Sequence, residues 1–212
     1  MAANDEPPPY RRGRAAAAWV LMMAAAPTLA TAAEILSPEQ VIATTADSFA
    51  TLVATRYAEL EADLDGDYAL IGEHLLPRFD LVSACHLILR NHWKTATPEQ
   101  KQRFVDAFYR FLLASYGTAL LEFRHDTVKV LPQEGGTAGA STRVRTKLTL
   151  TDGSMFNVDF YMRLDDRGWR VVDVIAEGIS YVRTYRSEFG LEIRAGSLDA
   201  LTARLEDVAG GP

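Results

Sequence analysis

Residues 143–176 read RVRTKLTLTDGSMFNVDFYMRLDDRGWRVVDVIA, and this stretch decides the fold. Apolar and polar side chains alternate along it with a period of two, which is typical of strands that bury one face. Asp152-Gly153 and the polar run at 165–168 interrupt the alternation and indicate tight turns between antiparallel strands. Together with a short alternating segment at 128–130, the pattern predicts a four-stranded antiparallel meander that ends near Ala176.

The two faces of this predicted sheet differ in polarity. One face carries the large apolar side chains of Val144, Leu148, Phe156, Val158, Phe160 and Met162. The opposite face carries the charged and polar side chains of Arg143, Arg145, Lys147, Asn157, Asp159 and Arg163. Because Asp159 lies on the polar face, we expect it to pair with Arg143 or Arg145. Asp173, in the last strand, is interpreted as an anchor for the helix that follows it.

Helical periodicity covers residues 37–123 and resumes after the sheet. Ser37-Pro38-Glu39-Gln40 and Thr97-Pro98-Glu99-Gln100 both match a capping box with proline in the first turn. Shorter helices are expected at about 67–76 and through Val82 to Trp93, and the chain closes with two helices, the last capped by Ser197. The longest predicted helix starts at the second capping box, and its apolar face carries Phe104, Phe108, Leu112, Tyr116, Leu120 and Phe123.

Helices followed by a curved meander predict an α+β fold, with N-terminal helices packed on the concave face of the sheet. A sheet covered in this way forms a cone, and a cone can enclose an apolar pocket. Candidate pocket-lining residues lie on the apolar sheet face and on the longest helix: Phe108, Leu112, Tyr116, Val144, Leu148, Phe156, Val158, Phe160 and Met162. The same residues could instead fill a solid core, and periodicity does not separate the two interpretations.

The first 32 residues resemble a secretory signal peptide. Arg11, Arg12 and Arg14 precede an apolar run at 15–26, and the small residues Ala30 and Ala32 fit a cleavage site. The run is short for a transmembrane helix, which needs about 20 apolar residues. We therefore predict a signal peptide at 1–32, a single domain at 33–208 and a tail at 209–212, with the periplasm as the destination.

Composition and motifs exclude several classes of protein. The net charge of −6 argues against a nucleic-acid partner, because phosphate binding needs a basic face. No histidine pair has metal-ligand spacing, and no phosphate-binding loop, dinucleotide fingerprint or nucleophile elbow occurs. The sequence therefore predicts no enzyme, no metal and no cofactor. The alternative is a cone-fold isomerase or hydrolase acting on a small apolar substrate, with Asp159 or Asp173 as its carboxylate.

Several stretches of the sequence resemble the MlaC-type, or toluene-tolerance, family. They are WKTATPEQ at 93–100 with the aromatic residues that follow it, WRVVDV at 169–174, EGIS at 177–180 and YRSEF at 185–189. Their order and spacing together carry the resemblance, which spans roughly residues 38–207. Tyr181 departs from it, because a smaller aliphatic residue is common at that position.

The resemblance implies a periplasmic phospholipid carrier with an NTF2-like cone, in which bound phospholipid is cargo. Such a carrier moves lipid between an outer-membrane lipoprotein complex and an inner-membrane ABC transporter that bears a lipid-binding ring. This traffic would maintain the lipid asymmetry of the outer membrane.

Overall fold

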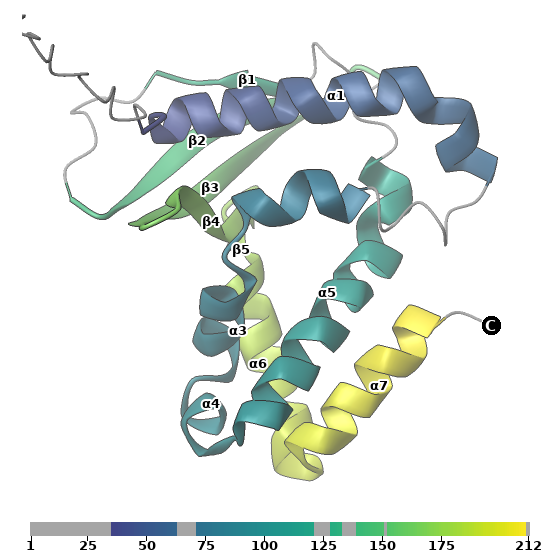
Figure 1. Cartoon of the computed structure of the whole chain (residues 1–212), viewed down its shortest axis with the longest axis vertical. Coiled ribbons are helices and arrows are strands. Elements are labelled where there is room, and N and C mark those ends of the chain that lie inside the picture. Colours follow the sequence, from purple (N-terminus) through teal and green to yellow (C-terminus); the bar gives the residue numbers. More distant parts are fainter. Residues whose placement is uncertain (1–34, 63–70, 121–127, 133–138, 151, 211–212) are drawn as a thin grey trace, which may run out of the picture. The chain divides into compact units, whose positions relative to one another are not determined.

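The computed structural model describes residues 35–62, 71–120, 128–132, 139–150 and 152–210. The predicted signal peptide, the start of the helix expected at about 67–76 and Phe123 lie outside these ranges. Within them the fold is α+β, as predicted, with helices and one antiparallel sheet in the order β1-β2-β3-β4-β5 (Figure 1). The strands are β1 (Val128–Val130), β2 (Ser141–Thr149), β3 (Met155–Asp165), β4 (Gly168–Ala176) and β5 (Ile179–Ser180).

The prediction of four strands was wrong by one, because β4 is followed by a short fifth strand. Ile179 pairs with Ala176 across a two-residue turn, in which Glu177 has a φ of 47° and Gly178 a φ of 81°. Two consecutive positive φ values make the tight hairpin turn that matches the twist of the strands. A strand of two residues has no measurable alternation, so sequence periodicity could not identify it.

The register of β2 and β3 follows the predicted apolar face. Val144 lies opposite Phe160, and Leu148 lies opposite Phe156. Between β3 and β4 the register shifts after Tyr161, which leaves Val172 as an extra residue on β4. A bulge of this kind bends the strand and increases its twist, so the sheet curves where the helices contact it.

The first helix, α1 (Pro38–Ala62), covers the apolar face of the sheet. Its capping box forms as predicted, with the Ser37 amide donating to Gln40 Oε1 at 2.8 Å and the Gln40 amide donating to Ser37 Oγ at 3.2 Å. The first turn brings Val41 and Ile42 onto buried sheet residues: Val144, Met162, Trp169 and Val171. The region between α1 and the sheet is therefore filled core near Val144 and Met162.

The helix expected through Val82 to Trp93 is two helices in the structure. Residues 71–75 are helical and run into a 3-10 turn at Leu76–Arg78, after which come α3 (Leu81–Leu89) and α4 (Asn91–Thr95). The break falls at Arg90, whose φ of 49° ends α3 while its amide still donates to the His86 carbonyl. Val82 is exposed, so the expected apolar face does not begin there.

A second core lies among α3, α5 (Pro98–Leu120), α6 (Tyr181–Ala195) and α7 (Leu198–Gly210). Figure 1 shows α5, α6 and α7 gathered below the sheet. Three aromatic rings pack together there, with no more than 6.1 Å between any two ring centroids: Phe104, Phe108 and Phe189. Gly190 lies inside α6, and α7 extends to Gly210, two residues beyond the expected end of the domain.

Candidate functional site

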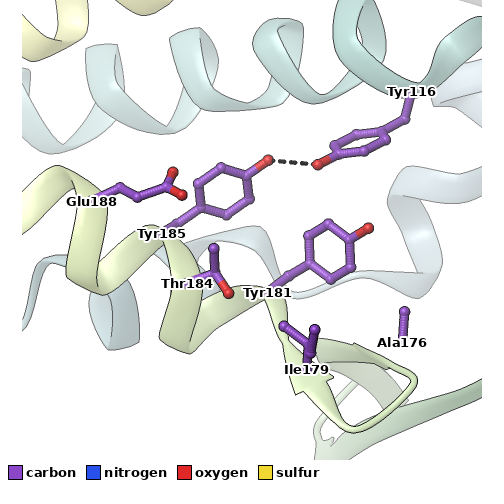
Figure 2. Close-up of a pocket in the computed structure, with 7 residues that line it drawn as sticks. All are labelled: Tyr116, Ala176, Ile179, Tyr181, Thr184, Tyr185 and Glu188. Atoms are coloured by element: carbon purple, nitrogen blue, oxygen red, sulfur yellow. Dashed lines mark hydrogen bonds between the residues drawn. The ribbon is translucent and has the colours of Figure 1, made fainter.

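A cavity of about 300 Å³ lies between α5, the N-terminal half of α6 and the β4–β5 hairpin. Most of its lining comes from one face of α6, as Figure 2 shows. Residues three, four and seven positions apart share a helix face, and the α6 residues in the lining have this spacing. The lining residues are Tyr116, Ala176, Ile179, Tyr181, Thr184, Tyr185 and Glu188.

Asp173 sets the position of α6 at the cavity. Its carboxylate accepts hydrogen bonds from Ser180 Oγ at 2.5 Å and from the Val182 amide at 3.0 Å. Ser180 is the N-cap of α6, and its hydroxyl accepts from the Arg183 amide at 3.0 Å. A negative charge that accepts from the first-turn amides stabilises a helix N-terminus. The prediction that Asp173 anchors the following helix is confirmed.

The β4–β5 hairpin is held in place by β3. The backbone amide of Glu177 donates to the backbone carbonyl of Asn157 at 2.9 Å, and the Glu177 carboxylate accepts from the backbone amide of Asn157. These bonds fix the turn that leads into Ile179. As a result the Ile179 side chain stands beside Ala176 at the cavity.

Three tyrosines form the aromatic wall of the cavity. Tyr116 Oη, from α5, lies 2.9 Å from Tyr185 Oη, from α6 (Figure 2). The Tyr181 ring stands edge-on to the Tyr116 ring, with 5.7 Å between the ring centroids. Burial raises the pKa of Tyr181 and of Tyr185, and proximity to Tyr116 raises both further. The hydroxyls of Tyr181 and Tyr185 are therefore neutral at physiological pH and act as hydrogen-bonding groups.

Apolar residues continue from the cavity onto the adjoining end of the sheet face. This end carries Ile179, Val158, Phe156 and Leu148 and is called the apolar edge below. Val158 lies opposite Ala176, and Phe156 is two residues further along the same strand face. Ile179 is 64% exposed and Phe156 is 39% exposed. Neighbouring exposed apolar side chains of this size are typical of ligand-binding grooves. The cavity and this edge together form an amphipathic site, with hydroxyls at one side and aliphatic and aromatic carbon at the other.

The candidate lining residues from the sequence fall into two groups. Tyr116 lines the cavity, while Leu148, Phe156, Val158 and Phe160 lie exposed or half-buried on the sheet face that continues from it. The others are in the packed cores: Phe108, Leu112, Val144 and Met162. Sequence reasoning missed the α6 residues, because their spacing is that of any helix packed on a core. The one signal for them was Tyr181, a large aromatic residue in place of a small one.

The carboxylates of the alternative enzyme hypothesis do not line the cavity. Asp159 is buried and accepts from Arg143 Nε at 2.8 Å, which confirms the predicted pairing with an arginine. Arg145 instead donates to the Pro132 carbonyl, and Lys147 is exposed. In the described part of the chain, no group of three His, Cys, Asp or Glu side chains could hold a metal ion. None of the helices in those ranges is both long and apolar enough to span a bilayer.

Comparison with known proteins supports a single family. The model of the MlaC protein family matches residues 36–207. The toluene tolerance protein ttg2D of Pseudomonas putida is 30% identical over 168 residues, which cover 78% of this chain and 76% of that protein. The intermembrane phospholipid transport system binding protein MlaC of Haemophilus influenzae is 20% identical over 180 residues, which cover 83% and 84%.

A solved structure has the same fold. The phospholipid-binding protein of Ralstonia solanacearum, determined in complex with a phospholipid, superposes with a TM-score of 0.76 at 23% identity. The match covers 82% of this chain and 98% of that one. Since the family match extends over nearly all of the described residues, the chain belongs to the MlaC protein family.

Proposed function

We propose that this protein is a periplasmic carrier that binds a phospholipid in the cavity beside α6 and along the adjoining apolar edge of the sheet. The observation that carries the proposal is the continuity between the cavity and exposed apolar side chains, above all Ile179 and Phe156. Two of the similar proteins are named for phospholipid binding or transport, which agrees with this assignment.

The energetics of the acyl tails require such a site. Two tails hold about 30 methylenes, and each methylene costs roughly 0.8 kcal/mol in water, so an unshielded lipid costs on the order of 20 kcal/mol. The cavity of about 300 Å³ is at the lower end of ligand-site volumes, which run from about 300 to 1,000 Å³. Both tails therefore need the sheet edge at Leu148, Phe156 and Val158 as well as the cavity.

The proposed carrier works between two membranes. Residues 1–32 act as a cleaved signal peptide, and the domain at 33–208 shuttles lipid between an outer-membrane lipoprotein complex and an inner-membrane ABC transporter with a lipid-binding ring. Bound lipid is cargo, the reaction needs no cofactor, and the protein performs no chemistry on the lipid. This traffic maintains the asymmetry of the outer membrane.

The experiment that tests the carrier is lipid analysis of the purified protein. The full chain is expressed with export, recovered from the periplasmic fraction and examined by native mass spectrometry and by lipid extraction. Phospholipid at close to one molecule per protein, delivered to acceptor vesicles on incubation, is the expected result. Protein that emerges free of lipid and acquires none from vesicles would overturn the proposal.

A further inference from the structure

A group of cations on α3, α4 and α6 lies outside the cavity lining, and we propose that it docks onto an acidic patch of a protein partner. The four cations are Arg90, Lys94, Arg186 and Arg194, and they are called the basic surface below. Arg186 is half-buried and the other three are exposed. The inference concerns a second site, so it does not depend on lipid binding.

The basic surface follows the seam between α3 and α6. Both helices start at β4, because the amide of Asp80, the N-cap of α3, donates to a β4 carbonyl and Asp173 of β4 anchors α6. The two helices pack against each other, and Arg186 Nε on α6 donates to the Leu87 carbonyl on α3 at 2.8 Å. Arg90 comes three residues after Leu87, so it lies within one helical turn of this contact.

Gly190 and Arg194 continue the surface along α6. Arg186, Gly190 and Arg194 are spaced by four residues, which places them along one ridge of the helix. A Cβ atom on Gly190 would lie 3.6 Å from Arg194 Nη1, so the Arg194 guanidinium lies close to the glycine. Among the residues that the structure describes, no carboxylate forms a salt bridge with any of the four cations.

Acidic residues are missing from this part of the chain. Residues 81–98, which include α3 and α4, contain none of the 28 aspartates and glutamates of the sequence. Of the two acids on α6, Glu188 lines the cavity and Glu192 pairs with Arg204 of α7 at 2.8 Å. The chain has a net charge of −6, which would be −10 without the basic surface. Positive charge is therefore concentrated here on an acidic protein.

The backbone of Arg90 is strained, although the fold makes no use of its side chain. Its φ of 49° and ψ of −107° are unfavourable for a residue with a Cβ atom and accessible to glycine. The Arg90 guanidinium makes no hydrogen bond to the described residues. Strained residues cluster at functional sites, where the side chain compensates for the strain. An arginine at this position is therefore explained by a contact outside the chain.

The chemistry of the surface fits an acidic protein better than an anionic bilayer. Val82 and His86 precede Arg90 at intervals of four on the exposed side of α3, and Val82 is 56% exposed. Arginine is enriched in protein interfaces and pairs with carboxylates through two parallel hydrogen bonds. A bilayer presents negative charge over a whole plane, which the acidic remainder of the chain opposes. A protein can confine its carboxylates to the area that meets the four cations.

Co-sedimentation with membranes tests the docking. The full exported chain is mixed at low salt with three probes from the cell that encodes it: envelope membranes, the same membranes after protease digestion, and protein-free vesicles of their extracted lipids. We expect binding to the untreated membranes and little to the other two. Raising NaCl to about 0.3 M should weaken this binding several-fold, because salt screens exposed ion pairs.

Charge-reversal variants locate the contact. Arg90→Glu combined with Arg194→Glu should weaken binding about tenfold, since two exposed ion pairs are lost and two repulsions are added. Lys129→Glu combined with Arg163→Glu makes the same change of charge at exposed sheet positions and should bind as the wild type does. Both variants should keep the wild-type lipid content, so failure of the docking proposal leaves the carrier proposal standing.

Arg90→Gly separates docking from folding. Glycine adopts the backbone angles of residue 90 without strain, so the midpoint of urea unfolding should rise while binding to the membranes falls. A variant that was only damaged in its fold would show a lower midpoint. Unchanged binding by Arg90→Gly would overturn the assignment of Arg90 to the contact.

A carbodiimide crosslink tests the acidic character of the partner. This reagent joins an amine to a carboxylate in direct contact, so Lys94 should give a crosslinked product of higher mass on untreated membranes. Lys94→Arg keeps the charge and should keep the binding, but it cannot form this product. A product that persists in Lys94→Arg would overturn the contact at Lys94.

The remaining outcomes each overturn the proposal. Binding to the lipid vesicles as strong as to the membranes would assign the surface to a bilayer. Equal binding by the wild type and the Arg90→Glu, Arg194→Glu variant would remove the basic surface from the contact. Wild-type protein that does not sediment with untreated membranes at low salt would show that no such partner exists there.

Discussion

Tyr116 and Tyr185 are 69 positions apart in the chain, and their hydroxyl oxygens lie 2.9 Å from each other. The bond joins the C-terminal part of α5 to α6 at the wall of the cavity (Figure 2). The Tyr185 ring is also packed edge-on against Phe108, with 5.2 Å between the centroids. The polar end of Tyr185 thus belongs to the cavity, while its ring belongs to the helical core.

Tyr185→Phe keeps this ring and removes the hydroxyl. Tyr116 then loses its partner at a half-buried position, and we expect the free energy of unfolding in urea to fall by about 1 kcal/mol. Tyr161→Phe is the matched control, since Tyr161 is exposed on the sheet and its hydroxyl makes no hydrogen bond to any residue that the structure describes. Equal stability of Tyr185→Phe and the wild-type protein would contradict a contribution from this bond.

Asp173→Asn weakens the anchor of α6. The amide oxygen of asparagine can still accept one hydrogen bond, but the charge near the helix N-terminus is gone, and one of the two present bonds is lost. We expect a loss of about 1–2 kcal/mol in unfolding free energy. Asp166→Asn, in the exposed β3–β4 turn, makes the same charge change. If both variants lose the same amount, net charge rather than the anchor is responsible.

Much of this architecture could be predicted from residue patterns. The alternation at 143–176 predicts that Val144 and Phe160 lie on the same apolar face, because a one-residue slip would turn that face outward, and the structure places the two residues opposite each other. The capping boxes at Ser37 and Thr97 form because their hydrogen bonds are local. Strand parity alone put Asp159 on the face of Arg143 and Arg145, and the structure selects Arg143 as its partner.

What could not be predicted depends on distances between elements. Periodicity assigns a residue to a face, but it does not say whether that face meets another element or an open space. Met162 and Phe156 share a sheet face, and one is fully buried beneath α1 while the other is 39% exposed. The tyrosines of α6 show the same limit of periodicity, since the Tyr185 ring packs in the helical core while its hydroxyl lies at the cavity. The bulge at Val172 and the break at Arg90 have no residue signature either.

The ion pair between Arg103 and Glu206 predicts a pH dependence of stability. Hydrogen bonds from Arg103, which joins α5 to α7, hold the pKa of Glu206 below its usual value of 4.5. Since the unfolded chain takes up this proton at higher pH, the stability that the pair adds is full above about pH 4.5 and is lost as the pH falls through the lowered pKa.

Urea unfolding of Glu206→Gln between pH 6 and pH 3 checks this sign. The variant should lose less stability on acidification than the wild-type protein, and Asp207→Asn serves as the neighbouring control. Because both partners are partly exposed, 1 M NaCl should shrink the difference between variant and wild type. A variant with the same pH slope as the wild type would show that the pair adds no stability.

Ile179→Asp tests the apolar edge that the carrier proposal depends on. A carboxylate there would face the acyl chains, and burying it under lipid leaves a charge without a partner, which is costly. Since Ile179 is 64% exposed, the fold itself loses little. We expect about a tenfold drop in the equilibrium constant for lipid retention, measured by extraction after dialysis against empty vesicles.

Leu191→Asp is the matched control, because Leu191 is 60% exposed on α6 and lies outside the cavity lining. Both variants should keep the wild-type circular dichroism spectrum. If Leu191→Asp lost lipid as strongly as Ile179→Asp, added negative charge would explain the loss, and the edge at Ile179 would have no special part in holding the tails.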